Sequence, residues 1–177
     1  MLLLIATLWA APLPQPGQLV TAASYADADL SGRDLNGTRF RYVDLTRTDL
    51  SGARLDGASF VGANLSRATL DAAHMPGAEI GQLDLTDASL RNSRLRGGHI
   101  YQSNLSRSRL DGADLRDTRW LDTDLTGADL RGVDLRGARL ERVNLSRADL
   151  TGADLRGVDL SGATLDGATC PDGQPCP

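Results

Sequence analysis

Residues 128–157 read ADLRGVDLRGARLERVNLSRADLTGADLRG, with Leu at every fifth position. The same register extends without a slip from Leu30 to Leu165, and Tyr25 and Cys170 stand in it at the two ends. A period of five matches neither the roughly 3.6 residues of a helical turn nor the two-residue alternation of a strand. The spacing therefore predicts a solenoid built from one short repeat. The large apolar residues that replace Leu in this series are Phe40, Phe60, Met75, Ile80, Ile100 and Trp120.

Two other positions of the repeat are also constrained. Two residues before the central residue the side chain is usually small, as at Ala53, Ala113 and Val133, which predicts a second inward position. Two residues after it, Gly stands in fifteen repeats between Gly32 and Gly167. Glycine is typical of a tight corner because it lacks a Cβ. Each repeat therefore consists of a small inward residue, a polar outward residue, a large inward residue and then a corner.

The pattern resembles the motif of the pentapeptide repeat family, A-(D/N)-L-x-x. Residues 63–67 (ANLSR), 113–117 (ADLRD), 128–132 (ADLRG) and 153–157 (ADLRG) match it, and the resemblance covers about four-fifths of the chain. It implies an all-β fold, a right-handed quadrilateral parallel β-helix in which four pentapeptides make one coil. About seven such coils are expected.

A second period, of twenty residues, independently supports four sides per coil. The bulky residues Phe40, Phe60 and Trp120 fall in one column of that period. In another column Asp and Asn alternate from Asp44 to Asn144. Stacked coils lie about 4.8 Å apart, so a column of Asp alone would place like charges at that spacing. The alternation makes sense if residues twenty apart are stacked neighbours.

Residues 1–23 differ from the repeats. The stretch from Met1 to Ala11 is apolar apart from Thr7, three prolines follow, and residues 21–23 are small. This composition resembles a secretory signal peptide, and the run is too short to cross a bilayer as a helix. Since no Lys or Arg precedes the run, an apolar cap on the solenoid and a misplaced start codon remain alternatives. If the segment directs export, the protein is expected to be periplasmic or extracellular. If it does not, the protein is expected to be cytoplasmic.

The β-helix is expected to occupy residues 24–170, followed by a short tail at 171–177. Cys170 takes the central position of the last repeat, and Cys176 follows a turn-forming sequence, PDGQP. In an oxidising compartment the two would form a disulfide that closes the rod's end. The alternative is that Cys170 is a small core residue.

The charge pattern argues against nucleic-acid binding. The chain of 177 residues has 23 acidic and 19 basic residues, a net charge of −4, and every basic residue is Arg. Acids and arginines are interspersed rather than gathered. One Arg column (Arg96, Arg116, Arg136, Arg156) follows an Asp column (Asp114, Asp134, Asp154) by two positions. These columns are expected to neutralise each other on a solvated face, with a charged binding stripe as the alternative.

One outward column combines aliphatic and aromatic residues with arginines nearby, which is typical of a protein-binding patch. Drift of the repeat at outward positions is the alternative. The predicted patch consists of Tyr42, Val61, His99, Tyr101, Arg119, Leu121 and Arg139, with Arg39 on the same side.

No phosphate loop, nucleophile elbow or zinc-binding spacing occurs in the sequence, and His74 and His99 are 25 residues apart. We therefore expect no catalytic residue, cofactor or metal site. The predicted function is a binding or structural scaffold with an unidentified protein partner, as a monomer or a weak end-to-end dimer. The family supplies an alternative, because some members protect DNA gyrase from quinolones by mimicking duplex DNA. Two observations argue against it: the register has no insertions, and the excess of acid is slight, with 13 acidic residues and 10 arginines from residue 101 onward.

Overall fold

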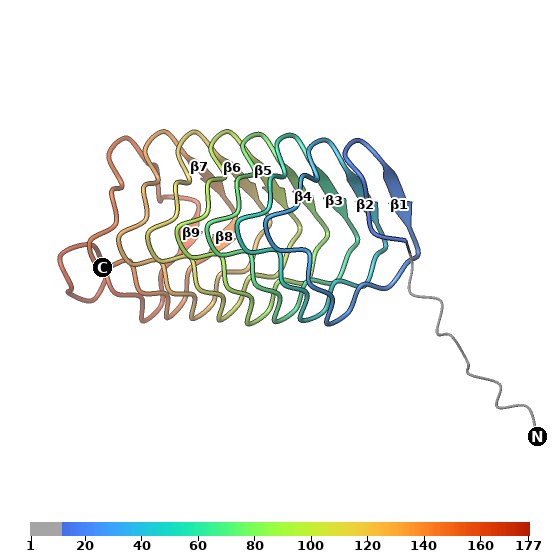
Figure 1. The fold of residues 1–177 in the computed structure, drawn as a ribbon. Coiled ribbons are helices and arrows are strands. Elements are labelled where there is room, and N and C mark those ends of the chain that lie inside the picture. The colour runs from blue at the N-terminus through green and yellow to red at the C-terminus, as the bar shows by residue number, and fades with distance from the viewer. Residues whose placement is uncertain (1–11) are drawn as a thin grey trace, which may run out of the picture.

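The computed structural model describes residues 12–177, which wind into a rod of stacked coils (Figure 1). Partner residues in neighbouring coils lie twenty positions apart on all four sides of the coil. This confirms the all-β parallel solenoid of about seven turns. Since residues 12–177 contain no long apolar helix, none of the described elements is able to cross a membrane as a helix.

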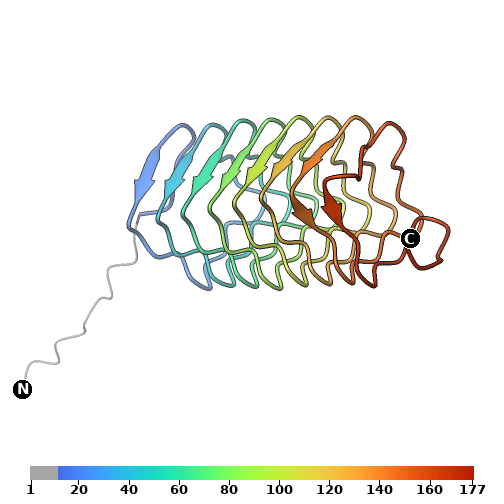
Figure 2. The ribbon, with the colours of Figure 1, turned by 180° about the vertical axis from the view of Figure 1, so that it is seen from behind.

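One side of the rod is a seven-stranded parallel sheet whose strands follow in chain order, as Figures 1 and 2 show. The strands are β1 (Leu19–Thr21), β2 (Arg39–Arg41), β3 (Ser59–Val61), β4 (Glu79–Gly81), β5 (His99–Tyr101), β6 (Arg119–Leu121) and β7 (Arg139–Glu141). A second sheet pairs β8 (Val143–Asn144) with β9 (Ala163–Thr164). Elsewhere the other three sides are joined by single-residue bridges, such as Asp49 with Thr69.

The register places the bulky column in the core of the long sheet. Phe40 pairs with Phe60, and their rings stack with centroids 4.8 Å apart and an interplanar angle of 10°. Ile100 pairs with Trp120, whose indole N–H donates to Thr118 Oγ1 at 2.9 Å. The predicted period of twenty is thus confirmed by direct stacking.

The small inward position is filled by alanines and by hydroxyl residues whose polar groups are satisfied locally. Ala53 and Ala113 are buried. Ser93 and Ser108 are also buried, and each donates to the carbonyl three residues earlier, at 2.6 Å. A buried hydroxyl without a partner would be costly, so these bonds explain why the position accepts Ser and Thr as well as Ala.

From Gly17 to Gly157 the corner of each repeat has a left-handed backbone, as predicted from its glycines. Gly52 has φ 63°, but non-glycine corners adopt the same conformation, for example Ala72 at φ 55°. The polar outward residue supports the turn that leads into the corner: Asp44 Oδ1 accepts the Thr46 N–H at 3.0 Å and the Thr46 hydroxyl at 2.6 Å. The Asp and Asn column therefore also stabilises turns.

The solenoid begins before residue 24. β1 pairs with β2, and Val20 is buried in the same column as Phe40. The difference from the expected boundary arises because Val20 continues the five-residue register into the segment assigned to the N-terminal region. Residues 1–11, the apolar part of the predicted signal segment, lie outside the described residues.

The last coil departs from the predicted regularity. No strand follows β7 in the long sheet, although Leu160 continues the sequence register. Gly162 lacks the positive φ of the other repeat-corner glycines, and its position lies against the Leu140 carbonyl. Leu155, Leu160 and Leu165 are only partly buried. In the described rod this coil contacts a neighbouring coil on one side only, so fewer contacts hold it in register.

The tail folds back over this end of the rod. Cys170 and Cys176 are joined by a disulfide, with Cα atoms 4.9 Å apart. Thr169 and Pro175 form an antiparallel bridge, and the Cys176 N–H donates to the Ala168 carbonyl at 2.9 Å. The tail therefore caps the last coil.

Candidate functional site

The outward surface of β1–β7, called here the strand face, contains all the residues of the predicted patch. Tyr42 stands at the corner after β2 and is 64% exposed, and the other members lie on the strands. The column that precedes the buried centres is Leu19, Arg39, Ser59, Glu79, His99, Arg119 and Arg139. The column that follows them is Thr21, Arg41, Val61, Gly81, Tyr101, Leu121 and Glu141.

Two tyrosine rings of this face lie over glycines. A Cβ placed on Gly81 would be 2.1 Å from Tyr101 Cζ, so the ring occupies the space that a side chain would need. A Cβ on Gly62 would likewise be 2.6 Å from the ring of Tyr42. Tyr42 thus tilts from the second coil toward β3, and Tyr101 tilts from β5 toward β4. The two rings lean toward the same part of the face.

A short hydrogen-bonded chain holds Tyr101 in place. Its hydroxyl donates to Glu79 Oε1 at 3.0 Å, and the Ser59 hydroxyl donates to Glu79 Oε2 at 2.9 Å. Partial burial, followed by the hydrogen bond to Glu79 and the charge of that carboxylate, raises the pKa of the Tyr101 hydroxyl. Tyr101 is therefore neutral at physiological pH and presents its ring to the face.

A shallow hollow of about 390 Å³ lies in this region. Sequence reasoning missed four residues of its lining, although each stands in register with a patch residue: Arg41 is twenty residues before Val61, and Glu79 is twenty before His99. The twenty-residue period was the signal that could have found them. The hollow is lined by Leu19, Arg39, Arg41, Ser59, Val61, Glu79 and Tyr101.

The arginines of the strand face have no acidic partner. Ion pairs among the described residues involve arginines of corners and of the other three sides, but not Arg39, Arg41, Arg119 or Arg139. Both glutamates of the chain lie on this face, and Glu79 is engaged by Tyr101 and Ser59. The face therefore presents unpaired positive charge beside aromatic and aliphatic groups.

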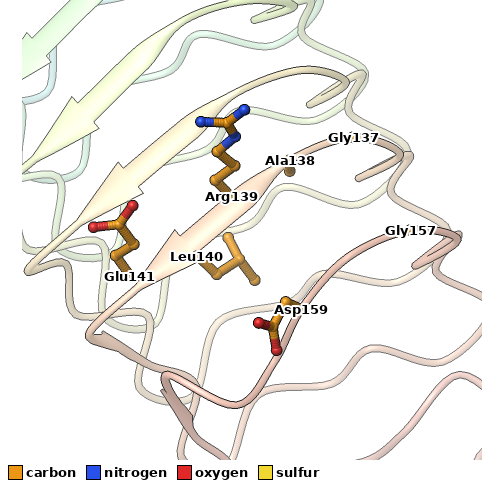
Figure 3. A pocket seen from close by; sticks show the side chains of 7 residues that line it. All are labelled: Gly137, Ala138, Arg139, Leu140, Glu141, Gly157 and Asp159. Carbon is orange, nitrogen blue, oxygen red and sulfur yellow. The ribbon is translucent and has the colours of Figure 1, made fainter.

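A second groove, of about 280 Å³, marks the end of the long sheet. Figure 3 shows Leu140 and Asp159 on its two sides. Two hydrogen bonds that earlier coils form at this position are missing here. The Asp159 N–H does not donate to the Ala138 carbonyl, and the Arg142 N–H does not donate to the Ser161 carbonyl. The slip of the last coil therefore leaves an open sheet edge beside β7.

Comparison with known proteins accounts for this architecture. A family model described as pentapeptide repeats matches eight copies in residues 26–62, 63–100, 103–142 and 144–171. The chain belongs to the pentapeptide repeat family. Among proteins with curated functions, none matches it.

Several solved structures, two of them described as pentapeptide repeat proteins, are similar to this one. A trypsin-treated form of QnrB1, a plasmid-mediated fluoroquinolone resistance protein, is 28% identical, with 86% of this chain and 82% of that chain covered and a TM-score of 0.52. HetL of Nostoc sp. strain PCC 7120, involved in heterocyst differentiation regulation, is 29% identical, with 93% and 92% covered and a TM-score of 0.44. A thylakoid lumen protein of Arabidopsis thaliana is 21% identical, with 68% and 70% covered and a TM-score of 0.46.

On a different side of the pentapeptide repeat rod, the Asp and Arg columns neutralise each other. Arg116 contacts Asp114 at 2.6 Å and Asp134 at 3.6 Å, and Arg136 contacts Asp134 at 2.6 Å and Asp154 at 3.4 Å. A hydrogen bond from the Arg156 side chain lowers the pKa of Asp154 to about 2. This ion-pair ladder uses the charges that a binding stripe would need.

The two histidines are not brought together in the repeat structure. His74 pairs with Asp56 on one side, and His99 is exposed on the strand face. Residues 12–177 contain no group of three metal-ligating side chains of the His, Cys, Asp and Glu types. The strand face is therefore the strongest candidate site of the described chain.

Proposed function

We propose that this pentapeptide repeat protein is a non-catalytic scaffold that binds another protein through the strand face, outside the cytoplasm. One observation carries the proposal: all four arginines of the strand face lack an ion pair and its tyrosines lie over glycines, whereas ten of the fifteen other arginines contact an aspartate. Aromatic residues and arginine are enriched in protein interfaces.

The form of the face supports binding rather than catalysis. The hollow is open and shallow, and its lining combines Leu19, Val61 and Tyr101 with two arginines. Catalysis needs convergent acid, base or nucleophilic groups in a site that excludes water. A rigid sheet instead suits recognition, because its side chains lose little freedom on binding.

Photo-crosslinking tests the binding face. A photoreactive amino acid in place of Val61 should crosslink a discrete protein in the native cells. The control places the same group at Thr151, which is exposed on the opposite side of the coil. The proposal is wrong if both positions give the same products or if position 61 gives none.

Export is supported by the bond between Cys170 and Cys176, since disulfides persist in oxidising compartments. The test is a secretion reporter fused after Asp27. Activity of the reporter outside the cytoplasm is expected, and retention in the cytoplasm would contradict export.

A second candidate is gyrase binding, and the similarity to QnrB1 favours it. Purified protein would then relieve quinolone inhibition of DNA supercoiling or inhibit supercoiling itself. If the protein changes gyrase supercoiling neither with nor without quinolone, gyrase binding is excluded and the scaffold function is the remaining candidate.

A further inference from the structure

We infer that the partner of the strand face presents a short acidic segment in extended conformation, with two carboxylates two residues apart and an apolar side chain beside them. The inference rests on the proposed function and specifies the chemistry of the partner. It is carried by Arg39 and Arg41 on β2, together with the tyrosines that lean over β3 and β4.

The two arginines have the geometry of a double carboxylate site. They flank the buried Phe40, so both side chains leave the sheet on its outer surface, and both are exposed. Residues two apart in a strand are separated by about 6.6–6.8 Å. Carboxylates two residues apart in an extended segment have the same spacing. Each guanidinium then accommodates one carboxylate through paired N–H donors.

No acidic group among residues 12–177 forms an ion pair with these arginines. Glu79 supplies the carboxylate in the lining of the hollow, and its two oxygens accept hydrogen bonds, one from Tyr101 and one from Ser59. The protein as a whole has a net charge of −4, so a local positive site would attract an acidic segment to this face in particular.

The apolar part of the site lies one coil further along the rod. Val61 follows Arg41 in the same column, about 4.8 Å away. The rings of Tyr42 and Tyr101 lean toward it, and they are seated on Gly62 and Gly81. An aliphatic or aromatic side chain next to the carboxylates would pack on these groups.

The length of the positive site favours a short segment over a long polyanion. Beyond β2, the next strands β3, β4 and β5 carry no arginine on the strand face, and arginine returns only at β6. These strands span about 14 Å at the usual strand spacing. A nucleic acid or an anionic polysaccharide would need a continuous row of positive charge over that length.

The test uses a fluorescein-labelled peptide with the pattern Glu-x-Glu next to Leu, and fluorescence anisotropy at low salt. Binding to the full chain is expected, and Arg39→Glu/Arg41→Glu should weaken it at least about tenfold. The matched control Arg119→Glu/Arg139→Glu reverses two unpaired arginines of the same face and should change affinity less than about threefold. Circular dichroism of all variants should be unchanged, because these arginines are exposed and unpaired.

The outcomes separate this inference from the proposed function. The inference is overturned if the peptide does not bind, if a peptide with Lys in place of Glu binds equally well, or if charge reversal at Arg39 and Arg41 has no effect. It is also overturned if duplex DNA or a heparin fragment binds more tightly through the same arginines. Crosslinking at position 61 decides the proposed function independently of these results.

Discussion

The strand face and the other three sides of the rod share one repeat but use their outward side chains differently. On the side of the ion-pair ladder, Asp134 and Asp154 contact arginines of their own coil and of a neighbouring coil. On the strand face the outward positions are held by varied residues, among them Arg, Glu, His, Ser, Tyr, Leu and Val, and the four arginines have no acidic partner among the described residues.

The difference follows from backbone geometry. Apart from the β8–β9 pair, the three bridged sides have one paired residue per coil, so their turns depend on side chains such as Asp44, which accepts the N–H two residues later. The strand face has three paired residues per coil, and its backbone bonds hold the coil without such support. Its outward positions are therefore free to differ from the repeat, which makes this side the place to look for recognition.

The largest effect is expected from a charge in the shared core. Leu105 is 1% exposed, and Leu105→Asp should destabilise the fold by at least about 3 kcal/mol, because a carboxyl group would be buried without a partner. Urea unfolding followed by circular dichroism measures the loss. The matched change Leu121→Asp, on the strand face, should cost less than about 1 kcal/mol. Equal losses would mean that Leu121 is a core residue and that the comparison is mistaken.

Removal of the disulfide should have the next largest effect. The variant with Cys170→Ser and Cys176→Ser loses the constraint on a short loop, worth about 2 kcal/mol at the end of the rod. Hydrogen exchange should show faster opening of residues 163–177 and unchanged protection of β2–β5, because solenoid coils depend on their neighbours. A reducing agent should affect the wild type in the same way and leave the double variant unchanged.

Acid should weaken the ion-pair ladder and spare the strand face. Hydrogen bonds from arginines hold the pKa of Asp134 and Asp154 below the usual value of 3.8, to about 2 for Asp154. Since the folded-state pKa is lowered, this stabilisation is complete above about pH 4 and is lost as the pH falls toward 2. Melting temperatures between pH 6 and 2 should show the fall.

Two variants test the acid prediction, one in the ion-pair ladder and one on the strand face. Asp134→Asn/Asp154→Asn should lower the melting temperature at neutral pH and flatten its decline in acid. Arg39→Gln/Arg41→Gln should leave the decline unchanged, because these arginines form no ion pair. A decline that is the same in all three proteins would show that the ladder contributes nothing to acid stability.

The smallest effect is expected at the corners. Ala72 is exposed and has φ 55°, so Ala72→Gly should stabilise the protein by about 1 kcal/mol through relief of the left-handed strain. Gly52→Ala should destabilise it by about the same amount, since φ is 63° and no atom lies near the added Cβ. Urea midpoints measure both changes, and opposite signs are required.

Most of the fold was predictable because the determining information is local. Five-residue spacing identifies the inward residues, and the column of Phe40, Phe60 and Trp120 identifies neighbouring coils. The slip at Leu160 was not predictable, because residues 158–162 (VDLSG) match the repeat well. Their departure is a matter of contacts between coils, which a five-residue motif does not contain.

The candidate site was predictable only in part. The period of twenty brought Val61, Tyr101 and Leu121 to one column, but it did not reveal that Tyr101 lies over Gly81. Ring placement depends on which neighbour lacks a side chain and on where Glu79 accepts a hydrogen bond. These are contacts between coils, and composition does not reveal them.

The sequence by itself determined the inward residues through its period of five and the four sides of the coil through its period of twenty, because both periods can be read along the chain without knowledge of any contact. The sequence already predicted that the column of Arg136 pairs with aspartates, but only the tertiary structure decided that the four arginines of the strand face are free. The physical reason is that an ion pair depends on the directions of two side chains in neighbouring coils. Arg39 and Arg136 both stand in arginine-containing columns, yet only Arg136 has a carboxylate within reach.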